Sequence, residues 1–197
     1  NVVENAREDR VPMIVLTGCV DPETAAVYTH QVLDQREVFK AVTKASFTLS
    51  AGVAHEIIDK AIGIATAGRP GPVHIDVPIS VADALATGAG VLRPPALPMA
   101  PAGAGLEAAR VALAKAQRPL IIAGVDAVAD AGAEAVQSAA EQLGAPVITT
   151  YKAKGLLPEE HALSLGGAGL SPKNDAVLLP FVRKADVILA IGYDPVE

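Results

Sequence analysis

Short, uninterrupted apolar segments alternate with helical stripes along most of the 197-residue chain. Continuous apolar runs that stop at glycine or proline are typical of strands buried on both faces, and stripes of period 3.6 indicate helices packed on them. The predicted strands are residues 12–18, 72–78, 120–124, 146–150 and 187–192, and the predicted helices are residues 1–9, 53–67, 106–117, 127–143 and 172–184. This alternation predicts an α/β fold with parallel sheets and right-handed crossovers.

A segment rich in proline and glycine, residues 82–104, interrupts the alternation. It holds Pro94, Pro95, Pro98 and Pro101, and each proline lacks a backbone donor and restricts the residue before it. We expect an extended linker that separates residues 1–81 from a Rossmann-like domain at residues 105–197. The first part shows only about two clear strands, and the last strand has no helix after it, so both ends of the chain look cut.

Composition excludes several classes of partner. The net charge of −6, the 3% aromatic content and the absence of tryptophan argue against nucleic acid. No apolar run approaches the roughly 20 residues that a membrane span needs. Cys19 is the single cysteine, which excludes a disulfide framework and fits a cytoplasmic protein.

Polar and glycine residues at predicted strand ends are the candidate functional groups. Gly18, Gly124 and Gly192 end three strands, where ligands bind in doubly wound sheets, but no G-x-G-x-x-G pattern accompanies them and turn glycines are favoured. Taken alone, His30, Gln31 and Lys44 would be ordinary solvated residues. His74 alternates with apolar neighbours inside a strand and is predicted to be structural. The histidines show no metal-ligand spacing.

The segment GRPGPVHIDVP, residues 68–78, resembles the end of the pyrimidine-binding domain of thiamine-diphosphate-dependent enzymes, and of acetolactate synthases most closely. Three segments precede it in the order of that family: DRVPMIVLTG (9–18), THQVLDQ (29–35) and FKAVTKAS (39–46). The segments RPLIIAG, PVITTYKAKGLLPEEH and KADVILAIGYDPVE follow and resemble the family's central domain. The closing GYDPVE is more similar to catabolic, flavin-free acetolactate synthases than to biosynthetic ones.

The resemblance implies a domain assignment. Residues 1–81 would be the C-terminal half of a pyrimidine-binding domain, and residues 105–197 a C-terminally truncated central domain. The glutamate that activates the cofactor, and the motif that holds Mg²⁺ and diphosphate, match nothing in this chain. The fragment alone is therefore predicted to be inactive. The full-length enzyme is expected to be a homodimer or homotetramer that uses thiamine diphosphate and Mg²⁺ on 2-oxo acids such as pyruvate.

Single residues are assigned by the same resemblance. Gln31 matches a glutamine at the reacting end of the cofactor, and His30 matches the residue before it. Lys44 matches a lysine near the substrate entrance. Flavin-bearing members carry a run of glycines where this chain has Gly124, and an arginine soon after the position of Gly192, which argues against FAD here.

Three functions stay open. The chain is part of a carboligase or decarboxylase, a nucleotide-binding module that uses its sheet ends for an adenine nucleotide or flavin, or a structural domain that packs against other domains. Neither the 2-oxo acid nor the choice between carboligation and decarboxylation follows from the sequence.

Overall fold

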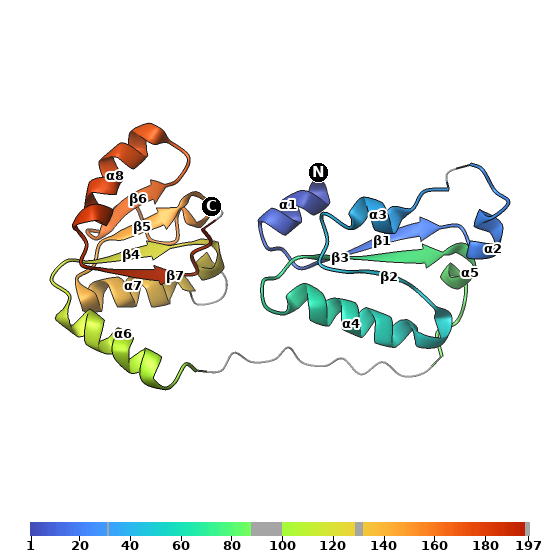
Figure 1. The fold of residues 1–197 in the computed structure, drawn as a ribbon, viewed down its shortest axis with the longest axis horizontal. Coiled ribbons are helices and arrows are strands. Elements are labelled where there is room, and N and C mark those ends of the chain that lie inside the picture. The colour runs from blue at the N-terminus through green and yellow to red at the C-terminus, as the bar shows by residue number, and fades with distance from the viewer. Residues whose placement is uncertain (31, 88–99, 129–131, 196–197) are drawn as a thin grey trace. The chain divides into compact units, whose positions relative to one another are not determined.

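The computed structural model describes residues 1–30, 32–87, 100–128 and 132–195. The chain divides into two compact units, Asn1–Pro98 and Met99–Glu197, and the described residues of each form one parallel sheet with helices (Figure 1). The predicted α/β fold with parallel sheets is confirmed.

The sheet of the first unit has the strand order β1–β3–β2. Helix α4 (Ala54–Thr66) covers one face, where Ala61 and Ala65 pack against Val73 and Ile75. Helices α1 and α3 lie on the other face (Figure 1). The remaining elements are β1 (Met13–Cys19), β2 (Ser46–Thr48), β3 (Pro72–Pro78), α1 (Val2–Glu8), α2 (Pro22–Ala25), α3 (Gln35–Phe39), α5 (Ile79–Ala82) and the 3₁₀ turn η1 (Ala51–Val53).

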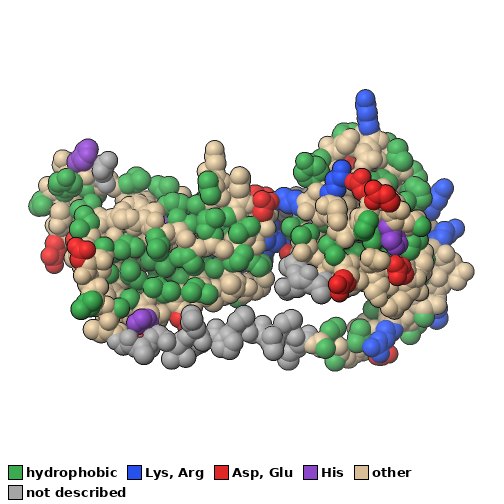
Figure 2. Space-filling model, turned by 180° about the vertical axis from the view of Figure 1, so that it is seen from behind, with side chains coloured by type: hydrophobic (Ala, Val, Ile, Leu, Met, Phe, Trp, Pro, Cys, Tyr) green, Lys and Arg blue, Asp and Glu red, His purple; other side chains and the backbone are tan. Residues whose placement is uncertain are grey.

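Hydrophobic side chains gather on one face of this first unit (Figure 2). Leu16 on β1 is 63% exposed although it lies two residues from Ile14, which packs into the core beneath α4. Ile58 and Ile62 on α4 are also exposed. β1 is an edge strand of the described sheet, so an apolar strand edge and part of a helix face lie open together.

The sheet of the second unit has the order β6–β5–β4–β7. Val136 and Ala140 of α7 pack on one face, and Leu178 of α8 packs on the other. The chain runs outward from β4 to β6 and then returns to β7, so the strand order reverses between β4 and β7. The elements are α6 (Ala104–Lys115), β4 (Pro119–Ala123), η2 (Val125–Val128), α7 (Gly132–Leu143), β5 (Val147–Thr150), η3 (Tyr151–Ala153), β6 (Ser164–Ala168), α8 (Pro172–Lys184) and β7 (Val187–Ile191).

Local sequence explains how α8 begins. The Ser171 hydroxyl caps the helix by accepting from the backbone amide of Asn174, and Pro172 occupies its first turn. The helix continues through Pro180 to Lys184.

The sequence failed to predict two strands. β2 has only three residues, and β6 contains two glycines among its five, so neither carries a clear apolar run. Residues 187–192 form a strand as predicted, but their predicted burial on both faces is wrong, because β7 is an edge of the described sheet and Ile188 is 43% exposed. Of the helix predicted over residues 127–143, residues 132–143 form helix α7, residues 127 and 128 belong to the short turn η2, and residues 129–131 lie outside the described residues.

Part of the predicted linker lies outside the described residues, namely residues 88–99. The flanking residues 83–87 and 100–103 form neither helix nor strand. The assignment of residues 1–81, 82–104 and 105–197 to particular domains stays a prediction.

Candidate functional site

The loop after β1 carries the predicted catalytic pair. It leaves the carboxyl end of β1, passes through α2 and reaches α3. His30 lies in this loop and is exposed, whereas Gln31 lies outside the described residues. Gln35, at the start of α3, donates from Nε2 to the carbonyl oxygen of Gly18 at 2.6 Å and so joins the two ends of the loop. The catalytic roles of His30 and Gln31 stay predictions.

Lys44 lies at the opposite end of the same sheet. Its backbone amide donates to the carbonyl oxygen of Pro72, the first residue of β3. Its ammonium group donates to the carbonyl oxygens of Ile64 at 2.5 Å and Ala67 at 2.7 Å, at the C-terminal end of α4. Burial lowers the pKa of Lys44. These contacts make Lys44 a cap of α4, and its place near a substrate entrance stays a prediction.

A buried polar chain crosses the sheet of the first unit. Thr17 has one hydroxyl proton and donates it to Asp76 Oδ1 at 2.9 Å, so the hydroxyl accepts from Nε2 of His74 at 2.7 Å. The other ring nitrogen, Nδ1, then accepts from the Ser46 hydroxyl at 2.6 Å.

The surroundings of His74 fix its protonation state. Its side chain is fully buried, and the Phe39 ring stacks on it with centroids 4.4 Å apart. Desolvation lowers the pKa of His74, which outweighs the attraction of Asp76. The ring is therefore neutral at pH 7, and every polar atom of the imidazole has a partner. This is the structural role that the sequence predicts for His74. The hydrogen-bonded chain through Thr17, Ser46 and Asp76 was not predicted from the sequence.

The strand ends of the second unit meet at the reversal of strand order, where open α/β sheets bind their ligands. There the backbone amide of Gly124 donates to Ile191 and that of Asp126 donates to Gly192. A side chain at Gly124 would lie 2.5 Å from the Gly192 carbonyl oxygen, and one at Gly192 would lie 2.2 Å from the amide nitrogen of Ala127. These glycines let two backbone segments cross, which agrees with turn glycines rather than a phosphate cradle.

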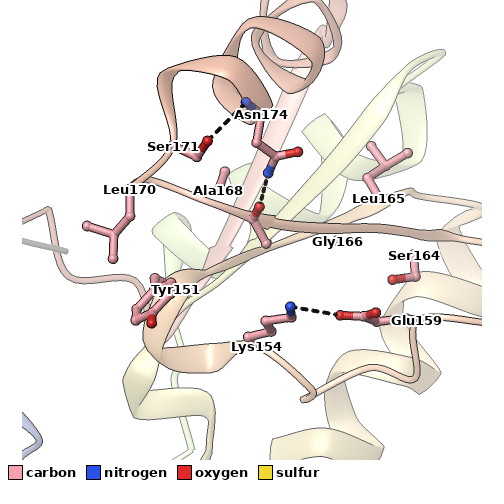
Figure 3. A pocket seen from close by; sticks show the side chains of 11 residues that line it. Tyr151, Lys154, Glu159, Ser164, Leu165, Gly166, Ala168, Leu170, Ser171 and Asn174 are labelled. Atoms are coloured by element: carbon pink, nitrogen blue, oxygen red, sulfur yellow. Dashed lines mark hydrogen bonds and ion pairs between the residues drawn. The ribbon is translucent and has the colours of Figure 1, made fainter.

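A pocket of about 580 Å³ lies beside β6 and the start of α8 (Figure 3). Lys154 and Glu159 form an ion pair at 3.4 Å along one wall, and Asn174 points from α8 and donates to the carbonyl oxygen of Gly167. Tyr151 and Leu170 lie at the other end of the pocket (Figure 3). Because its two charged side chains pair with each other, the pocket offers a ligand mainly neutral polar groups, from Tyr151, Ser164, Ser171 and Asn174, beside apolar contacts.

Among the described residues, no three histidine, cysteine, aspartate or glutamate side chains come together in a way that could hold a metal ion. No helix in the described part of the chain is long and apolar enough to cross a membrane.

The second unit is a Rossmann-like α/β domain, with a parallel sheet of order β6–β5–β4–β7 and helices packed on both faces. The family model of the thiamine pyrophosphate enzyme central domain matches residues 106–197. The resemblance to thiamine-diphosphate-dependent, acetolactate-synthase-like enzymes predicted from the sequence is confirmed.

Curated relatives match both units. A probable acetolactate synthase large subunit of Methanocaldococcus jannaschii is 34% identical over 96% of the chain and 33% of its own length. The acetolactate synthase large subunit of Corynebacterium glutamicum is 29% identical over 96% of the chain and 31% of its own length. A probable 2-ketoarginine decarboxylase of Pseudomonas aeruginosa is 32% identical over 96% of the chain and 34% of its own length. The chain spans about a third of the length of these relatives.

Proposed function

We propose that this chain is part of a longer thiamine-diphosphate-dependent enzyme, similar to acetolactate synthases, that acts on 2-oxo acids such as pyruvate. The observation that carries the proposal is the similarity to acetolactate synthase large subunits over 96% of the chain, across both units. The open apolar edge at β1 and α4 supports it, because such a surface is normally covered by further protein (Figure 2).

The cofactor would carry the chemistry of carbon–carbon bond cleavage and formation. In this proposal Gln31 and His30 contribute polar groups at the reacting end, Lys44 lies near the substrate entrance, and the ligands of Mg²⁺ and diphosphate come from outside the chain. The similarity to a probable 2-ketoarginine decarboxylase leaves decarboxylation open beside carboligation. We also propose that the complete enzyme is a cytoplasmic homodimer or homotetramer and contains no FAD.

The test compares the 197-residue chain with the complete protein that contains it. Both are assayed for CO₂ release and acetolactate formation from pyruvate with thiamine diphosphate and Mg²⁺. We expect activity in the complete protein and none in the chain alone. Failure of the complete protein on pyruvate and on a panel of other 2-oxo acids would contradict the proposal, and turnover by the chain alone would contradict its role as a part.

Gln31→Ala in the complete protein tests the residue assignment. Loss of one positioned polar group at a reacting centre typically lowers turnover by about 10²–10³-fold. We expect that loss with nearly unchanged affinity for thiamine diphosphate and Mg²⁺, measured by titration, because Gln31 is assigned to the reacting end rather than the diphosphate. Full activity in the variant would make Gln31 an ordinary loop residue.

A second candidate is a ligand-binding role of the second unit, and the pocket beside β6 is the observation that favours it. Mass spectrometry of the denatured, purified chain would detect a retained ligand. Self-association without any ligand would instead favour a structural domain.

A further inference from the structure

A second cavity of the second unit differs from the pocket in Figure 3. It has a volume of about 300 Å³ and lies between α8 and the carboxyl ends of β5 and β6. Ile148, Leu178 and Val182 contribute apolar walls, and Tyr193, which follows β7, lines the cavity with a ring that is 45% exposed. Its size is at the lower end of small-molecule sites, which suits a ligand of one or two rings.

Thr150 is a buried polar residue in the wall of this cavity. Its side chain lines the cavity and is 6% exposed, and its hydroxyl oxygen is buried without a hydrogen-bond partner among the described residues. A buried hydroxyl without a partner is costly, and most such groups in proteins are paired. Thr150 therefore presents one unused hydrogen-bonding group in an otherwise mostly apolar cavity.

Charge restricts the ligand. No lysine or arginine is among the residues that line the cavity, and the Asp175 carboxylate, which accepts from the backbone amide of Gly169 at 2.9 Å, faces it. An anionic ligand would meet this carboxylate without a compensating cation. A phosphorylated ligand is disfavoured for that reason.

The neighbouring strand reversal offers no alternative anchor for phosphate. The amides of Gly124, Asp126 and Ala127, which follow β4 where a dinucleotide-binding loop would present its donors, all donate to backbone carbonyls. A diphosphate would have to displace these bonds, and the backbone segments at Gly124 and Gly192 cross too closely to admit even a methyl group between them.

We propose that this cavity binds an uncharged, mostly apolar ring compound that carries one hydrogen-bonding group, which pairs with the Thr150 hydroxyl. The ring lies among Ile148, Leu178 and Val182 with Tyr193 beside it. This ligand class is distinct from nucleotides and flavins, and the inference does not depend on the proposed 2-oxo acid chemistry.

Indole is a suitable probe because it is an uncharged ring with one N–H donor. Indole-3-carboxylate is the matched anionic probe. Binding to the 197-residue chain is measured by saturation-transfer NMR and calorimetry. We expect saturable, one-to-one binding of indole and about tenfold or more weaker binding of the carboxylate. Equal affinity for both probes, no saturable binding, or displacement of indole by one equivalent of FAD would overturn the proposal.

Two variants from different walls locate the site. Thr150→Val keeps the shape of the side chain and removes the hydroxyl, and we expect about a tenfold loss of indole affinity, the usual worth of one hydrogen bond. Its control is Thr66→Val, because the Thr66 hydroxyl donates to Ile62 in the first unit.

The second variant is Leu179→Glu, which places a carboxylate at the rim of the cavity. Leu179 is 45% exposed, so the fold should tolerate the change. Its control is Val177→Glu on the same helix, since Val177 is 64% exposed and does not line the cavity. We expect loss of indole binding in Leu179→Glu and unchanged binding in Val177→Glu. Unchanged binding in both Leu179→Glu and Thr150→Val, with unfolding midpoints unchanged, would overturn the proposal.

Discussion

The buried polar groups lie at the centre of the sheet in the first unit and at the strand ends in the second. In the first unit the centre of the sheet is polar, since His74, Thr17 and Asp76 form one hydrogen-bonded chain under α3, while apolar side chains lie open at the β1 edge. In the second unit both faces of the sheet are apolar and the polar features lie at the strand ends, at the Gly124–Gly192 crossing and Thr150. We therefore expect the first unit to be sensitive to loss of a hydrogen-bond partner within its sheet, and the second unit to be sensitive to added bulk at its strand ends.

Substitution at the crossing should give the largest loss in the second unit. Gly192 has a φ of +60°, and an added methyl group would lie 2.2 Å from the amide nitrogen of Ala127. We expect Gly192→Ala to lower the free energy of unfolding by about 3 kcal/mol or more, from backbone strain and steric overlap together. Chemical denaturation monitored by amide exchange separates the two units.

A matched control is Gly105→Ala in α6, where nothing lies within 4 Å of the added methyl group. Helix propensity predicts stabilisation by about 0.5–1 kcal/mol. If Gly192→Ala were as stable as Gly105→Ala, the close approach of the backbone at Gly192 would not limit the stability of the second unit.

Removal of His74 tests the polar centre of the first unit. His74→Leu leaves the Thr17 and Ser46 hydroxyls without their ring partner in a buried sheet, so we expect a loss of about 2–3 kcal/mol confined to the first unit. His161→Leu is the control, because His161 contacts Glu141 near the surface at 3.3 Å, and its loss should be below about 1 kcal/mol. Amide exchange in β1 and β3 is the measurement. A stable His74→Leu variant would mean that apolar packing alone holds this sheet.

The two units should also respond differently to mild acid. Because the pKa of His74 is lowered in the folded state, the unfolded chain binds a proton first as pH falls below about 6.5. The unfolded state then binds more protons than the native state, so stability falls with pH from about 6.5 downward until the folded ring is protonated. For one titrating group, the free energy of unfolding cannot change by more than about 1.4 kcal/mol per pH unit.

Unfolding of the first unit, measured at pH 8, 6 and 5, should show this loss, and His74→Leu should remove it. A first unit equally stable at pH 8 and pH 5 would contradict the buried neutral state of His74.

Lys44 should give the smallest effect. Lys44→Met keeps the aliphatic stem but removes two hydrogen bonds to the end of α4, so we expect a loss of about 1 kcal/mol and faster amide exchange in the last turn. Lys115→Met in the last turn of α6 is the control, with an expected change within about 0.5 kcal/mol. In the complete protein, a raised KM for the 2-oxo acid with unchanged stability would assign Lys44 to the substrate entrance instead.

The sequence by itself determined the α/β class, both parallel sheets and most helices, because those features depend on local periodicity and on glycine and proline. Ser171 and Pro172 predicted the start of α8, and the alternation of Val73, His74 and Ile75 predicted a structural histidine. Ordered segments also predicted the family, which the comparisons bear out.

Tertiary structure decided the remaining features. Strands β2 and β6 form because neighbouring strands supply their hydrogen bonds. A three-residue segment or one that contains glycines carries no apolar pattern from which a strand could be predicted. Thr17 and Ser46 become partners of His74 only because β1 and β2 flank β3, and the cap of Lys44 on α4 joins residues 20 and 23 positions apart. Likewise, the Thr150 hydroxyl is without a hydrogen-bond partner only in the folded protein, because its burial at the end of β5 removes it from water.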